Sequence, residues 1–247
     1  MNKRGHGFYV IMAILALFLV GYAYKILVID RETNKSYEVG RGLVNLHFAN
    51  EEYNEVINFL DFSFSYAVLD ALENYSSKDD VWTKPPENIE IDIEKIVLAN
   101  FVNRMNDFGE KIKGAKLVTF PKIFHVKIIK NNGVFTANLV SDDDLLLGGL
   151  TPIARQATPG IILYKKLEFE KGVDFDLDIY DELYDKYAKL DSCPSQNELF
   201  DKYPVKCEEK KVSDQESYLH YEVETEDLGL IKPVIKFNIP KTGNLFT

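Results

Sequence analysis

The chain has 247 residues, of which 46% are hydrophobic, and this share argues against a disordered protein because it can supply a packed core. It carries 29 Lys and Arg residues against 39 Asp and Glu residues, a net charge of −10. The first 29 residues hold three of the bases and none of the acids, which leaves 26 bases against 39 acids in the remainder. This acidity argues against nucleic-acid binding, which depends on basic patches.

The first predicted element is a transmembrane helix at residues 8–29. The run FYVIMAILALFLVGYAY has no charge, and after Lys25 the apolar sequence continues to Ile29. A helix over this range is about 33 Å long, which is enough for the roughly 30 Å hydrocarbon core of a bilayer. We therefore predict that the lipid bilayer is a partner of the chain through this segment.

Basic residues at the N-terminus predict the orientation of this helix. Lys3 and Arg4 precede the apolar run, and the positive-inside rule keeps such a terminus in the cytoplasm. The sequence thus predicts a signal anchor at 1–30 in the cell membrane and an extracytoplasmic domain at 31–247. A cleaved signal peptide is one alternative, because Gly21 and Ala23 place small residues at a cleavage-like position. A buried helix of a soluble fold is the other.

The same terminus resembles the leader of archaeal type IV prepilins. Lys3-Arg4-Gly5 is followed directly by the apolar run, and in that family cleavage follows the glycine. The family's mature subunit keeps the hydrophobic helix and polymerises through it. The resemblance covers about the first 25 residues, and Val10 stands where the family often has Glu. It implies a pilin-like surface subunit.

Two long helices are predicted next. After a polar stretch, residues 43–76 carry apolar side chains at helical spacing, and Phe59, Phe62 and Tyr66 add a second apolar side. A helix that is apolar on more than one side is buried in its own fold or packed on a partner, and we expect a central core helix. A second helix follows the Lys84-Pro85-Pro86 connector, with apolar residues at steps of three and four from Ile93 to Ile112.

The apolar period then changes to two, which predicts strands joined as hairpins. The strongest turn signal is Asn131-Asn132-Gly133 between strands at 123–130 and 134–140. Further strand pairs are expected at 161–170 with 173–179, around Lys171-Gly172, and at 218–224 with 233–239; a helix is expected at 180–190. Helices followed by hairpins predict an α+β fold with a mostly antiparallel sheet.

No catalytic, cofactor-binding or metal site is predicted. The chain lacks a phosphate-binding glycine loop, a nucleophile elbow and a His-Glu-x-x-His pair. His125 and His220 could share a metal only if their strands were neighbours, and ordinary half-buried histidines are far commoner.

Two acidic sets are candidate metal or catalytic sites. Asp174, Asp176 and Asp178 have the spacing of the first calcium-loop ligands, but Ile179 stands where that loop needs glycine. Their alternation with apolar residues predicts the solvated face of a strand, with calcium as the open alternative. Residues 142–144, three consecutive Asp, are interpreted as an acidic turn.

Cys193 and Cys207 are the only cysteines and are predicted to form a disulfide. Both lie on the side placed outside the cytoplasm, where such bonds persist. Between them, Ser195 and Glu198 form a helix-start signal, and Pro204 ends the expected short helix. A turn, a short helix and a return would bring the two thiols together.

Together these features predict a single-pass, membrane-anchored extracytoplasmic protein with a structural or binding role. The absence of a catalytic motif favours a non-enzymatic protein. Its helices could bind a protein partner or mediate self-association. The alternatives are an extracytoplasmic hydrolase that uses Asp or Glu, and the pilin-like subunit.

Overall fold

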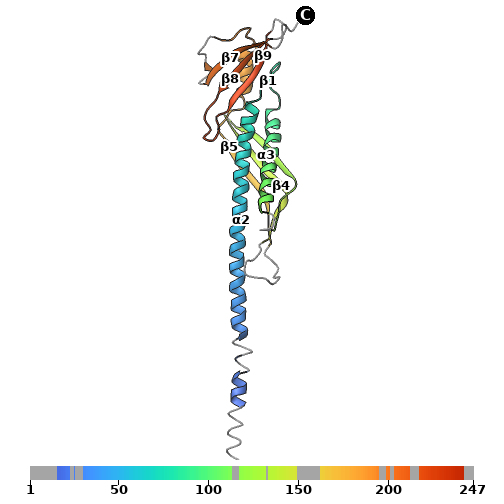
Figure 1. Cartoon of the computed structure of the whole chain (residues 1–247), viewed down its shortest axis with the longest axis vertical. Helices are drawn as coiled ribbons and strands as arrows, with labels where there is room; N and C mark the ends of the chain where they lie inside the picture. The colour runs from blue at the N-terminus through green and yellow to red at the C-terminus, as the bar shows by residue number, and fades with distance from the viewer. Residues whose placement is uncertain are drawn as a thin grey trace, which may run out of the picture.

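The computed structural model describes residues 16–22, 25, 30–112, 117–131, 133–148, 162–194, 199–200, 203–211 and 217–241. They form an α+β fold with mostly antiparallel sheets, as predicted (Figure 1). Most of the predicted transmembrane helix at 8–29 lies outside the described residues, as do residues 195–198 of the expected short helix. The rest of that short helix is not formed, because Leu199–Phe200 and Tyr203–Lys211 are strands and Pro204 lies in the second of them. Within the described ranges, no helix is both long enough and apolar enough to cross a membrane.

One long helix organises the molecule. Helix α2 runs over Asp30–Ser76, 47 residues, and is therefore about 70 Å long. Figure 1 shows its C-terminal half alongside α3, β4 and β5, while its N-terminal half projects beyond α3 and both sheets. We call residues 30–52 the shaft, and residues 53–241, as far as they are described, the head. The helix begins well before the predicted residue 43, so the polar stretch is helical too.

The core of the head forms around the C-terminal half of α2. Seven of its apolar residues are at most 1% exposed: Val56, Leu60, Phe64, Ala67, Val68, Ala71 and Leu72. Helix α3, Ile89–Ile112, packs on α2 and buries Ile93, Val97 and Phe101 completely. The prediction of a core helix is therefore confirmed for this half of α2.

The first sheet covers the two helices. It consists of β2 (Leu117–Thr119), β3 (Phe124–Asn131), β4 (Val134–Gly148) and β5 (Ile162–Val173), and all its pairings are antiparallel. The β3–β4 hairpin is the one predicted, and Gly133 has a positive φ of 82° in its turn. Residues of β4 that alternate along the strand, such as Phe135, Ala137 and Leu139, are fully buried.

The second sheet lies at the distal end of the head (Figure 1). Its strand order is β1-β9-β8-β7-β6, with β1 at Asp80–Val81, β6 at Leu199–Phe200, β7 at Tyr203–Lys211, β8 at Ser217–Glu224 and β9 at Val234–Pro240. The β8–β9 pair was predicted, whereas β1, which is parallel to β9, was not. Helix α4, Ile179–Tyr187, packs on this sheet, and the Tyr187 ring lies 4.7 Å from that of Tyr221.

Three of the predicted turns and strands are wrong. Lys171-Gly172 is no turn, because β5 continues to Val173 with Gly172 opposite Thr136. The expected strand at 173–179 is instead an irregular segment that leads into α4, although Phe175 and Leu177 are buried. Residues 142–144 likewise form no turn, since they lie inside β4, where the pairing with β5 shifts register as in a β-bulge.

Candidate functional site

The predicted disulfide is present. Cys193 and Cys207 are joined with a Cα–Cα distance of 5.6 Å, inside the range such a bond requires. The bond ties the chain that follows α4 to strand β7. It is therefore a structural crosslink at the distal end of the head.

The structure places the two candidate metal-binding histidines, His125 and His220, in different sheets. His125 is on β3 in the first sheet, and its Nε2 lies 3.1 Å from Asp142 Oδ2. His220 is on β8 in the second sheet. Because their strands are not neighbours, the geometric condition for a shared metal is not met.

His220 belongs to a polar cluster that holds the segment after α2 to the second sheet; His220 and Asn238 in it are buried, and Asp79 is exposed. Its Nδ1 lies 3.0 Å from Asp79 Oδ1 and 3.0 Å from Asn238 Oδ1. The Asn238 amide also donates a hydrogen bond of 2.7 Å to Asp79 Oδ1. Burial raises the pKa of the Asp79 carboxyl, but the Asn238 hydrogen bond and the charges of His220 and Lys210 outweigh it, and the net pKa is lowered. We interpret the cluster as a structural clamp.

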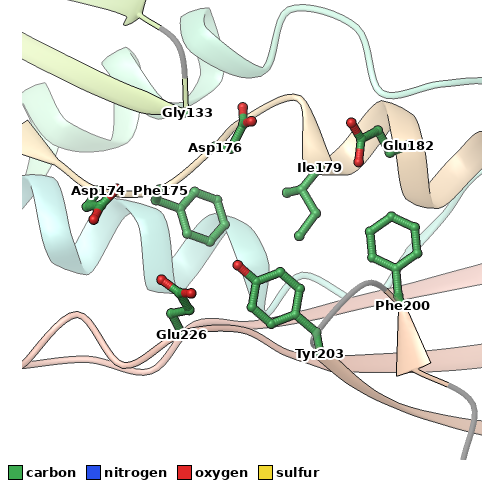
Figure 2. Close-up of a pocket in the computed structure, with 9 residues that line it drawn as sticks. All are labelled: Gly133, Asp174, Phe175, Asp176, Ile179, Glu182, Phe200, Tyr203 and Glu226. Carbon is green, nitrogen blue, oxygen red and sulfur yellow. The ribbon is translucent and has the colours of Figure 1, made fainter.

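A pocket of about 270 Å³ lies where the β3–β4 turn, the segment between β5 and α4, and strands β6 and β7 meet (Figure 2). Its lining includes four carboxylates: Asp174, Asp176, Glu182 and Glu226. Figure 2 shows Ile179 pointing from the start of α4 toward Tyr203, with Phe175 on one side and Phe200 on the other. The pocket is acidic and has aromatic walls.

Only part of the predicted acidic set reaches this pocket. Asp178 is paired with Lys130, whose Nζ lies 3.0 Å from Asp178 Oδ1 and 2.9 Å from Glu90 Oε1. Asp176 Oδ1 accepts a hydrogen bond from the Asp178 backbone N–H. Among the residues that the structure describes, no three Asp, Glu, His or Cys side chains are placed to hold a metal ion. The geometry thus gives the calcium alternative no support.

Residues 142–144 do not line the pocket either. Their side chains are exposed on the bulge of β4, and Asp142 faces His125. A glycoside hydrolase needs two carboxylates that face each other across a cleft, and the bulge does not provide one. The hydrolase alternative therefore has no support from these three residues.

A second concavity, of about 430 Å³, lies between α2 and α3. We call it the helix groove; its lining residues are Phe59, Phe62, Ser63, Tyr66, Arg104, Asp107 and Phe108. Phe59 and Phe108 stack with ring centroids 3.9 Å apart. Arg104 pairs with Asp70 and lies 5.7 Å from the centre of the Tyr66 ring.

The second apolar side of α2 predicted the aromatic residues of the helix groove. The sequence did not predict its polar residues. Phe62 is 64% exposed and Tyr66 is 43% exposed in the chain alone. Arg104 and Asp107 on α3 carry no local signal, because only the packing of α3 against α2 brings them to this surface.

Comparison with other proteins adds no further assignment to these sites. No family model, no curated protein and no solved structure matches the chain.

Proposed function

We propose that the chain is a single-pass membrane protein that displays its head outside the cytoplasm on a helical shaft, in a structural or binding role. The observation that carries the proposal is the division of α2 into a projecting half and a half that forms the core of the head (Figure 1). Such a helix holds a folded unit at a distance from its point of attachment. The disulfide fits an oxidising compartment, where such bonds persist.

The described part of the proposed anchor also supports membrane insertion. Residues 16–22 are helical, and Leu17, Phe18, Leu19 and Val20 are 63–75% exposed. Exposed apolar side chains in such a continuous group mark a surface that is covered by lipid or by another protein. A bilayer would cover them all.

A pilin-like subunit is the second candidate. The long N-terminal helix with both sheets on its distal half favours it, because in this arrangement a helix could pack with other helices while the heads stay outside. The prepilin-like Lys3-Arg4-Gly5 agrees with it. In both candidates the N-terminus lies in the cytoplasm and the head lies outside. They differ in whether many chains polymerise through their helices.

Topology provides the first test. A reporter that is active only in the cytoplasm, fused after Thr247, is expected to be silent, because Lys3 and Arg4 should retain the N-terminus inside. The same reporter fused before Met1 is the matched control and should be active. Activity of the C-terminal fusion would contradict the proposed orientation.

Anchoring provides the second test. We expect Leu17→Arg to shift the chain out of the membrane fraction, since a charge near mid-bilayer costs about 2.5–3.5 kcal/mol. Leu17→Ile is the conservative control and should stay in the membrane. If Leu17→Arg also fractionated unchanged with the membrane, attachment would have to occur through the head.

A further inference from the structure

The C-terminal end of α2 carries a glycosylation acceptor sequence. Asn74-Tyr75-Ser76 matches the pattern Asn-x-Ser/Thr, in which the middle residue is not proline. A transferase that uses this pattern attaches a sugar to the asparagine side chain and recognises the hydroxyl two residues later. Asn34-Lys35-Ser36, near the start of α2, has the same pattern. Such modification occurs in secreted parts of proteins, which is where we place both sequences.

The surface around Asn74 has room for a glycan. Asn74 is exposed, and so are Glu73, Ser77 and Lys78 next to it. We propose that the Asn74 side chain is N-glycosylated, and that the sugar is attached before the head has folded. The inference rests on the proposed orientation of the chain, because it requires Asn74 to reach the outer side of the membrane.

The folded head hides the hydroxyl that the transferase must recognise. Ser76 is 1% exposed, and its Oγ lies 2.8 Å from the hydroxyl of Tyr180, a buried residue of α4. Side chains two residues apart on a helix do not face the same side. Asn74 thus faces solvent while Ser76 faces the core, and a transferase cannot bind both side chains of the folded helix. Attachment must therefore precede the packing of α4 on α2.

The order of synthesis leaves time for this attachment. Tyr180 follows Ser76 by 104 residues. Chains are synthesised from the N-terminus at about 5–20 residues per second, so Ser76 is without this partner for about 5–20 s. A helix also depends largely on packing for its stability, so the last turn of α2 can be extended in this period. The acceptor sequence is thus open to a transferase while the rest of the head is still being made.

The reaction needs a sugar donor, which we identify by class as a lipid-linked oligosaccharide. The bond between the anomeric carbon of its first sugar and the lipid phosphate breaks, and a bond from that carbon to Asn74 Nδ2 forms. The lipid phosphate leaves with the electron pair, and Nδ2 gives one proton to a base of the transferase. No group is oxidised or reduced.

Peptide mass spectrometry of the full chain, isolated from membranes of the organism that produces it, tests the proposal. The peptide that contains Asn74 is expected to be heavier by the mass of a glycan. Ser76→Ala should abolish the modification although Asn74 is still present. Ser77→Ala is the matched control and should stay modified, because Ser77 is the adjacent serine and lies outside the acceptor sequence.

Two further variants separate recognition of the hydroxyl from stability of the head. Ser76→Ala removes the buried hydrogen bond to Tyr180 as well, whereas Tyr180→Phe removes the same hydrogen bond and leaves the acceptor sequence intact. Tyr180→Phe should be glycosylated to the same extent as the wild-type chain, because the sugar is attached before α4 packs on α2. Ser76→Thr keeps the hydroxyl and should also be glycosylated.

Three results would overturn the inference. They are a wild-type chain with no sugar on Asn74, even if Asn34 carries one; a Ser76→Ala variant that stays glycosylated; and a Tyr180→Phe variant whose glycosylated fraction rises several-fold, which would show that folding limits attachment. The reporter fused after Thr247 separates this inference from the proposed function. With a silent reporter, an unmodified Asn74 would refute only the glycosylation, whereas an active reporter would refute the orientation on which the glycosylation rests.

Discussion

Replacing Phe64 by alanine is expected to destabilise the head by about 3–5 kcal/mol, the usual cost of emptying a buried phenylalanine site. Phe64 is fully buried on α2, and its ring centroid lies 6.1 Å from that of Phe101 and 6.2 Å from that of Phe169. It therefore joins both long helices to the first sheet. Urea unfolding of the full chain in detergent micelles, followed by near-ultraviolet circular dichroism, measures the change.

Tyr164→Ala is the control for this experiment. It also removes an aromatic ring, but from an exposed position, and surface substitutions usually change stability by no more than about 0.5 kcal/mol. Equal losses for the two variants would contradict the position assigned to Phe64 at the centre of the core.

Loss of the disulfide is the second change with a large expected effect. The double variant Cys193→Ser, Cys207→Ser should be less stable by about 3 kcal/mol, because the bond closes a loop of about 15 residues and limits the unfolded chain. The thermal midpoint of the head, compared with that of the unmodified protein under non-reducing conditions, measures the effect.

A chemical control establishes that the bond itself is responsible. Alkylation of unreduced protein, read by mass spectrometry, should label no thiol, and labelling after reduction should modify both cysteines. Two labelled thiols before reduction would contradict the disulfide, and unchanged stability of the double variant would show that it contributes little.

Elements with strong local signals were predicted from the sequence. The β3–β4 hairpin followed from the turn residues that end in Gly133, which adopts the positive φ that such turns need. Helix α3 and the packed half of α2 followed from their apolar spacing. In these segments the local preference and the tertiary packing agree.

The errors arose where packing produced a misleading pattern. Phe175, Leu177 and Ile179 alternate with acids as in a strand, yet they are buried from an irregular segment and the first residue of α4. Gly172 is a glycine without a positive φ, so it lies in β5 like any other residue. The alternating pattern at 173–179 and the glycine at 172 therefore did not indicate a strand and a turn.

The candidate sites were less predictable than the fold, because they depend on contacts between distant segments. The clamp joins Asp79 to Asn238, 159 residues away, and no spacing in the sequence indicates that contact. Similarly, Glu226 reaches the acidic pocket only because the two sheets meet there. The disulfide could be predicted because the chain offers a single pair of cysteines.

The short strand β1 determines when the head can finish folding. Asp80 and Val81 pair with Phe237 and Asn238 of the last strand, and the Trp82 ring stacks on Phe237 at 4.2 Å. Contacts between such distant segments form slowly, and chains emerge N-terminal end first during synthesis. Strand β1 therefore stays unpaired, and Trp82 stays exposed, until β9 has been synthesised. The head should therefore be most vulnerable to proteolysis and aggregation just before β9 joins the second sheet.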